Sequence, residues 1–209
     1  MRKVSSRITE ALTRDVFGQK LIDNNFRGPW TEYMVAEALG DECVVVSHSW
    51  HAWDLQLGNS EDTFPARIRI QVKNTARLQT WHRPNGRLTN CQWMLKMRRK
   101  PYYFDTYNPN VPCEDYGYMC DVFVLCHHPV EDPEIADHRD PNQWEFYVVP
   151  VTPHHRIFPI KAGRQDQKTS SSYTVVPASL GKGIRGRPPI KPLSFDQLSP
   201  ASIRSSLDA

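Results

Sequence analysis

The chain has 209 residues, a formal net charge of +3 and a hydrophobic content of 39%, which is ordinary for a globular protein with one core. No apolar run approaches the roughly 20 residues of a membrane-spanning helix, and the first residues lack the apolar segment of a signal peptide. We therefore expect one globular domain, no membrane segment and a cytoplasmic location.

Charged residues are grouped along the chain rather than spread evenly. Residues 67–100 contain ten Lys or Arg and no acid, residues 105–145 contain ten acids and one Arg, and residues from 153 onwards contain nine basic and three acidic residues. A basic block opposed by an acidic one is typical of a protein that binds a polyanion through one face. An ordinary solvated basic surface is the alternative interpretation.

Helical patterns dominate the first 40 residues. Apolar residues recur at steps of three to five across residues 1–27, which predicts helix that packs on the domain or takes part in a dimer contact. Residues 28–40 predict a clearer helix, which Pro29 opens and Gly40 closes.

Glu32 shares one face of this second predicted helix with Val35 and Leu39. An acid on an apolar face is costly unless it is paired or binds a cation, so Glu32 is a candidate metal ligand. Two alternatives stay open. Glu32 could be an exposed first-turn acid that complements the helix dipole, and Glu37, on another face, is the rival candidate.

Three strands are predicted next. Residues 43–47 indicate a short buried strand, and residues 52–57 and 67–74 alternate between apolar and polar side chains as half-buried strands do. Gly58 and Pro65 lie in the loop between the last two segments, which therefore can pair as an antiparallel hairpin.

The predicted hairpin separates two kinds of side chain. Its apolar face carries Trp53, Leu55, Leu57, Ile68, Ile70 and Val72. Its polar face carries Asp54, Arg67, Arg69, Gln71 and Lys73. Pairing of Leu57 near Arg67 would place Asp54 near Ile70 or Gln71. An acid, an amide and a lysine are then expected to converge on one patch.

Such a patch suits hydrolysis of a phosphodiester. A hard divalent cation prefers oxygen ligands, which a carboxylate, an amide and a backbone carbonyl can supply. A lysine beside the cation orients a water molecule and offsets the charge that develops on the phosphoryl group.

The pattern resembles the PD-(D/E)XK nuclease superfamily, whose signature is an acid on one strand and an acid-x-lysine triplet on the next. Asp54 and Gln71-Val72-Lys73 match this motif in its Gln-x-Lys variant, and Gln71 departs from the more common Glu or Asp. Gly28 and Glu32 match the Gly-x-x-x-Glu context of members related to Holliday-junction resolvases and Mrr-like proteins.

The resemblance implies a Mg²⁺ site, with Mn²⁺ as a substitute, in which Glu32, Asp54, Gln71 and the Val72 carbonyl are ligands and Lys73 assists the attacking water. It also implies an α/β, restriction endonuclease-like core with a central mixed β-sheet flanked by helices. We assign this core to residues 28–152, a helical segment to residues 1–27, and a Pro-, Ser- and Lys/Arg-rich extension to residues 153–209.

A further helix is predicted after Lys73, capped by Thr89 or Asn90 and running to about Arg99. In the resembling family this helix lies along the nucleic acid, so the basic residues around it are expected to contact phosphates without reading sequence. The predicted DNA contacts are Arg67, Arg69, Arg77, Arg83, Arg87, Lys96, Arg98, Arg99 and Lys100, with Arg185 and Arg187 in the extension.

Two hydrophobic strands are predicted at residues 120–126 and 143–151. Asp121, at the start of the first, either supports the site electrostatically or is an ordinary strand-end residue. Trp93, Met94 and Met97 are interpreted as core residues rather than as platforms for bases.

Two other motifs receive less weight. Cys113, Cys120, Cys126, His127 and His128 lack the Cys-x-x-Cys spacing of a structural zinc site, so zinc is not expected. The segment Arg185-Gly186-Arg187-Pro188 looks like the core of an AT-hook, and a basic loop before a helix near residues 194–204 is the favoured alternative.

We therefore expect a metal-dependent endodeoxyribonuclease that acts on double-stranded or branched DNA, associates with the nucleoid when bound, and has a homodimer as one option for its assembly. The alternative is a non-cleaving DNA-binding module on the same fold, in which Gln71 is the trace of lost activity. No Gly-rich phosphate loop ending in Lys-Ser/Thr occurs, so no ATP site is expected.

Overall fold

The computed structural model describes residues 4–47, 53–59, 62, 65–81, 88–98, 118, 120–151, 170–182 and 189–208. At its centre is a mixed five-stranded sheet with the strand order β1-β2-β3-β5-β6. The strands are β1 (Cys43–Val45), β2 (Leu55–Leu57), β3 (Ile68–Ala76), β5 (Val122–His128) and β6 (Glu145–Pro150). Neighbouring strands are antiparallel except β3 and β5, which are parallel.

Alternation along β5 and β6 divides the buried residues between the two faces of this sheet. Val124 and Phe146 belong to one hydrophobic cluster, whereas Leu125 and Tyr147, one residue further on, belong to another. The predicted hydrophobic strands at residues 120–126 and 143–151 are thus confirmed, and both are buried on both faces.

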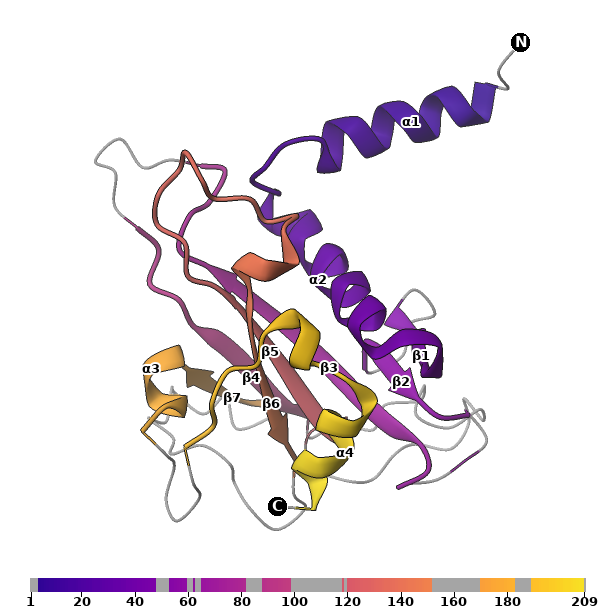
Figure 1. Ribbon diagram of the computed structural model, residues 1–209, viewed down its shortest axis with the longest axis vertical. Coiled ribbons are helices and arrows are strands. Elements are labelled where there is room, and N and C mark those ends of the chain that lie inside the picture. The colour runs from indigo at the N-terminus through magenta and orange to yellow at the C-terminus, as the bar shows by residue number, and fades with distance from the viewer. Residues whose placement is uncertain are drawn as a thin grey trace.

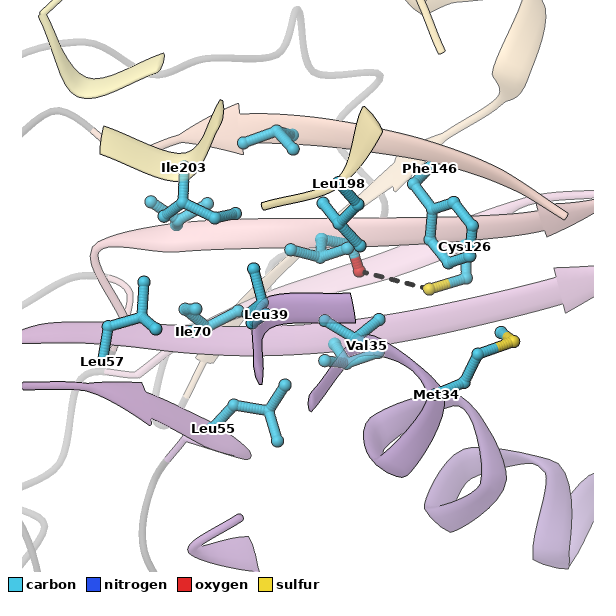
Figure 2. Packing of buried hydrophobic residues seen from close by; sticks show 14 of the residues in the cluster. Met34, Val35, Leu39, Leu55, Leu57, Ile70, Cys126, Phe146, Leu198 and Ile203 are labelled. Carbon is cyan, nitrogen blue, oxygen red and sulfur yellow. Dashed lines mark hydrogen bonds between the residues drawn. The ribbon is translucent and has the colours of Figure 1, made fainter. Parts of the chain in front are cut away.

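Helices cover the first face of the sheet. Helix α2 (Asn24–Leu39) and helix α4 (Pro200–Leu207) lie on this side, as Figure 1 shows. Figure 2 shows Met34, Val35 and Leu39 of α2 directed at the sheet, with Leu198 and Ile203 from the C-terminal segment in the same cluster. An α/β architecture with a mixed sheet flanked by helices is therefore confirmed. The C-terminal segment contributes to this core, which the sequence analysis did not anticipate.

A second, two-stranded sheet lies on the other side of the central one. It pairs β4 (Trp93–Arg98) with β7 (Ser170–Val175) in antiparallel register, and the short helix α3 (Pro177–Leu180) follows β7. Trp93, Leu95, Val175 and Leu180 pack against Phe123 and Leu125 of β5.

The predicted helix that Thr89 or Asn90 would cap is wrong, because residues 93–98 form strand β4. Trp93 and Leu95 are buried while Met94 and Lys96 are exposed, which is the period of two that a half-buried strand requires. Trp93 is thus a core residue as predicted, whereas Met94 is 52% exposed and is not. The side chain of Met97 lies outside the described part.

The start of helix α2 and the burial of strand β1 differ from the predictions. Helix α2 begins at Asn24, with Asp23 as its N-cap, so Pro29 lies inside the helix instead of opening it; Gly40 ends the helix at φ 68°, as predicted. Strand β1 is not a buried strand, because it is an edge of the sheet and Val44 is exposed.

Helix α1 (Val4–Phe17) extends away from the rest of the molecule in Figure 1. Its apolar residues Val4, Ile8 and Leu12 are all exposed and do not pack on the domain. The expected packing is confined to the end of the helix, where the Phe17 ring lies 6.3 and 5.4 Å from the ring centroids of Phe26 and Trp30 in α2. Short 3-10 helices occupy Gly40–Glu42, Pro141–Gln143 and Phe195–Gln197. Among the described residues, no helix is long and apolar enough to cross a membrane.

Candidate metal centre on strands β2 and β3

The predicted hairpin is present. Strands β2 and β3 are antiparallel, with Leu55 opposite Ile70 and Leu57 opposite Ile68, one position from the expected register. Asp54 immediately precedes β2, and its backbone N–H donates to the Ile70 carbonyl at 2.9 Å. The carboxylate is therefore held beside the middle of β3.

Three groups of β3 approach a single oxygen atom of Asp54. Gln71 Nε2 donates to Asp54 Oδ2 at 2.6 Å, and the backbone N–H of Val72 donates to the same atom at 2.8 Å. Lys73 Nζ lies 4.0 Å from this oxygen. The structure thus brings Asp54, Gln71 and Lys73 together across two strands, as the alternation predicted.

Asp54 occupies a largely buried position. Its side chain is 15% exposed, and burial raises the pKa of the carboxyl above its usual value, although Lys73, the Val72 N–H and Gln71 each act in the opposite direction. A carboxylate whose charge is only partly stabilised by its surroundings gains from a cation placed beside it.

The Val72 carbonyl is directed to the same side of β3 as Asp54. A strand residue presents its N–H and C=O toward the same neighbouring strand, and the Val72 N–H points to Asp54. The N–H and C=O groups of the odd-numbered β3 residues point to β5 instead. The Asp121 N–H, immediately before β5, donates to the Arg69 carbonyl. One carboxylate and one backbone carbonyl can therefore face a cation beyond the start of β2.

Gln71 currently presents its amide nitrogen to Asp54. Rotation of the amide group by 180° would present Oε1 instead, which is the end a cation between the two side chains would select. The site has the donor types that Mg²⁺ and Mn²⁺ accept. No group of three or more His, Cys, Asp or Glu that could hold a metal ion occurs within the described residues, so any ligand set here depends on amide and carbonyl oxygens.

Glu32 is linked to this site through Ser47. Ser47 Oγ donates to Glu32 Oε2 at 2.7 Å, and the Ser47 backbone N–H donates to the Asp54 carbonyl at 3.2 Å. The rival acid, Glu37, is exposed. Ser47 was not among the predicted site residues. Its place at the end of the predicted strand 43–47 was the only sign in the sequence that it could lie near the site.

Trp53 does not share a face with Leu55 and Leu57 as predicted, because it belongs to the cluster on the opposite side of the sheet. Regular pairing of β2 begins only at Leu55, so the period of two does not extend back to Trp53. The guanidinium groups of Arg67 and Arg69 lie over its ring, at 5.8 and 5.6 Å from the ring centroid.

Two of the predicted DNA contacts are engaged in ion pairs. Arg69 Nη2 lies 2.9 Å from Asp121 Oδ1, and Arg77 Nη2 lies 2.6 Å from Glu131 Oε1. Asp121 also accepts the Arg69 backbone N–H, which is the role of a strand-end residue that fastens β3 to the start of β5.

Lys96 is exposed and Arg67 is half-buried. The remaining predictions lie outside the described residues: Arg83, Arg87, Arg99, Lys100, Arg185 and Arg187, with the side chain of Arg98. The AT-hook-like segment and Cys113 also lie there. Cys120 is buried just before β5, and Cys126 is buried within it.

Comparison of the chain with protein-family models, with curated proteins and with solved structures found no match.

Proposed function

We propose that the protein is a metal-dependent endodeoxyribonuclease of the PD-(D/E)XK type, with Asp54, Gln71 and Lys73 as its catalytic residues. The observation that supports this most strongly is the convergence of Gln71, Val72 and Lys73 on one oxygen of Asp54. Because these three residues are consecutive on β3 and Asp54 immediately precedes β2, their spacing is close to the one that the resemblance implies.

The Asp54 carboxylate, the Gln71 amide oxygen and the Val72 carbonyl would hold a divalent cation, with Glu32 as a further acid on the far side of Ser47. The cation, when bound, supplies the positive charge that makes a water molecule a better nucleophile and stabilises the transition state. Lys73 is 36% exposed, so its ammonium group can contact both solvent and a phosphate. It orients the attacking water and offsets negative charge on the phosphoryl oxygens.

A non-cleaving DNA-binding module is the second candidate function, and one observation favours it. The amide nitrogen of Gln71 donates a hydrogen bond to the same Asp54 oxygen that would bind a cation. An amide oxygen is also a weaker ligand than the second carboxylate that most members of the resembling family carry.

Plasmid nicking with Mg²⁺ or Mn²⁺ separates the two candidates. We expect the wild-type protein to nick supercoiled DNA, Lys73→Ala to lose at least about a hundredfold in rate, and Gln71→Glu to be as active or more active. Lys191→Ala is the matched control, because Lys191 is exposed in another part of the chain and its loss should leave the rate unchanged.

If the protein is a non-cleaving DNA-binding module, we expect no nicking by any variant in either metal. We then also expect DNA binding that weakens steeply as the salt concentration is raised. Absence of salt-dependent DNA binding would contradict both candidates, and equal nicking by the wild type and Lys73→Ala would contradict the catalytic assignment.

A further inference from the structure

A cysteine, a histidine and a glutamate meet on the side of the central sheet that faces the β4–β7 sheet. Thr75, His127 and Glu145 are neighbours across β3, β5 and β6 in the strand registers. Gln92 donates its backbone N–H to Thr75 Oγ1 at 3.3 Å, and the ring of Trp93 lies edge-on to the His127 ring with centroids 6.2 Å apart. The segment that carries Cys91 is therefore fastened directly over His127.

Glu145 holds the histidine ring from one side. His127 Nδ1 lies 2.9 Å from Glu145 Oε2, and Tyr147 Oη donates to the same carboxylate oxygen at 3.1 Å. His127 is 8% exposed, and its second nitrogen, Nε2, makes no hydrogen bond of good geometry with any described residue. A buried imidazole nitrogen without a partner is uncommon and calls for a functional reason.

Cys91 also interacts with the His127 ring. Burial favours the neutral imidazole, but the interactions of the ring with Cys91 and Glu145 outweigh burial and raise the pKa of His127 to about 9. The Cys91 thiol makes only a weak hydrogen bond of 3.9 Å to the Thr89 carbonyl. Neither the thiol nor Nε2 is thus held by a strong interaction that would keep a Cys91 thiolate from pairing with the His127 imidazolium.

We propose that Cys91 is a reactive thiol, activated by the His127–Glu145 pair, and a site of oxidation by small hydroperoxides. Cys91 is buried, with 9% of its surface exposed, so an oxidant that reaches it must be small. A cysteine beside a histidine that a carboxylate orients is the arrangement that promotes thiolate formation. This site is separate from the candidate metal centre and does not depend on the proposed nuclease activity.

The chemical step transfers one oxygen atom. The Cys91 thiol loses its proton to solvent beside the His127 imidazolium, and the thiolate sulfur attacks one oxygen of the hydroperoxide. The S–O bond forms as the O–O bond breaks, so sulfur is oxidised to a sulfenic acid and the peroxide is reduced. The departing oxygen takes the proton from the His127 imidazolium and leaves as water or an alcohol.

Cys43 provides an internal control in the same chain. It is more exposed than Cys91, but burial raises the pKa of its thiol to about 11. Exposure alone would therefore make Cys43 the faster thiol, whereas the Cys91–His127 contact predicts the reverse order. Treatment of the intact wild-type protein with hydrogen peroxide at pH 7, with trapping by dimedone and peptide mass spectrometry, measures both rates in one sample.

We expect Cys91 to be oxidised at least about tenfold faster than Cys43. Glu145→Gln and His127→Gln should each slow Cys91 by about tenfold or more, while Glu42→Gln, which removes an exposed acid paired with Arg204, should not. Glu145 is 38% exposed, so its substitution tests the proposal even if the His127 variant does not fold. Oxidation of Cys91 no faster than Cys43, or a rate that Glu145→Gln leaves unchanged in folded protein, would overturn the proposal.

Discussion

Asp54 shows at the scale of one residue how the carboxylate of the candidate site is kept at the expense of stability. Its Oδ2 atom receives two hydrogen bonds and has an ammonium group at 4.0 Å, yet burial still raises its pKa. A group whose folded-state pKa is raised binds protons more readily in the folded than in the unfolded protein. The ionised form of Asp54 therefore disfavours the folded state above that pKa.

Replacement of Asp54 by asparagine removes this charge but keeps an oxygen that can accept the Val72 N–H. We expect Asp54→Asn to raise the urea midpoint of unfolding at pH 7, since stabilising substitutions are common at functional sites. The wild type should approach the variant as pH falls through the raised pKa of Asp54. Asp208→Asn, at an exposed position, should change the midpoint little. A lower midpoint for Asp54→Asn at pH 7 would contradict this account.

The position of helix α2 depends on one buried arginine. Arg27 is 2% exposed, and its guanidinium donates to the side-chain oxygens of Asn74 at 2.9 Å, Gln79 at 2.8 Å and Asn24 at 2.7 Å. Burial lowers the pKa of Arg27 to about 10, so the group stays charged at neutral pH. These bonds connect α2 to β3 and to the segment after it, and they fix the part of α2 that carries Glu32 relative to the candidate metal centre.

Removal of Arg27 should destabilise the protein strongly. Arg27→Ala removes a buried charged group that donates to three side chains and leaves the buried amide oxygen of Gln79 without its donor. We expect it to lower the free energy of unfolding by about 3 kcal/mol. Urea denaturation measures this change. Arg14→Ala in α1 is the control, because the Arg14 side chain is 73% exposed and its ion pair with Asp15 should contribute less than about 1 kcal/mol. Equal stabilities of the two variants would show that Arg27 does not anchor α2.

Strand β4 illustrates where sequence patterns are ambiguous at the scale of an element. Residues 93–98 follow a loop and contain residues acceptable in helices, and only the alternation of Trp93 and Leu95 with Met94 and Lys96 indicates a strand. The strand is stabilised by β7, which lies more than 70 residues away in the chain. A partner at that distance leaves no local signal.

At the scale of the whole molecule, the segment before α2 is attached to the loop between β5 and β6. His138 Nδ1 accepts a hydrogen bond from the Ile22 backbone N–H at 3.0 Å, and the His138 backbone N–H donates to the Lys20 carbonyl at 2.7 Å. The His138 ring packs on the rings of His128 and Trp144. Burial, together with the positive charges of His128 and Arg27, lowers the pKa of His138 to about 3.

This histidine should make the protein sensitive to acid. The unfolded chain protonates His138 below about pH 6.5, whereas the folded protein resists protonation until about pH 3, so stability falls progressively between these values. Urea midpoints measured from pH 7 to pH 4 should decrease more steeply for the wild type than for His138→Gln. Parallel curves for the two proteins would contradict the assignment.

Sequence patterns predicted the candidate site better than the architecture around it. The alternation along β3 determined which side chains share a face, and the hairpin brought Asp54 to Lys73 because residues 58–67 let β2 and β3 pair directly. Burial of Leu198 and Ile203 could not be predicted in the same way, since these apolar residues lie in a segment rich in Pro, Ser and basic residues. Leu198 and Ile203 pack against strands that lie far away in the chain. They complete the hydrophobic cluster between the helices and the central sheet.

The central claim is that Asp54 and its neighbours on β3 bind a divalent cation. Calorimetric titration of Mn²⁺ into the folded protein tests this most directly. We predict one site in the wild type, loss of that site in Asp54→Asn, and tighter binding in Gln71→Glu, where a carboxylate replaces the amide. Equal Mn²⁺ binding by the wild type and Asp54→Asn, or no binding by the wild type, would contradict the account.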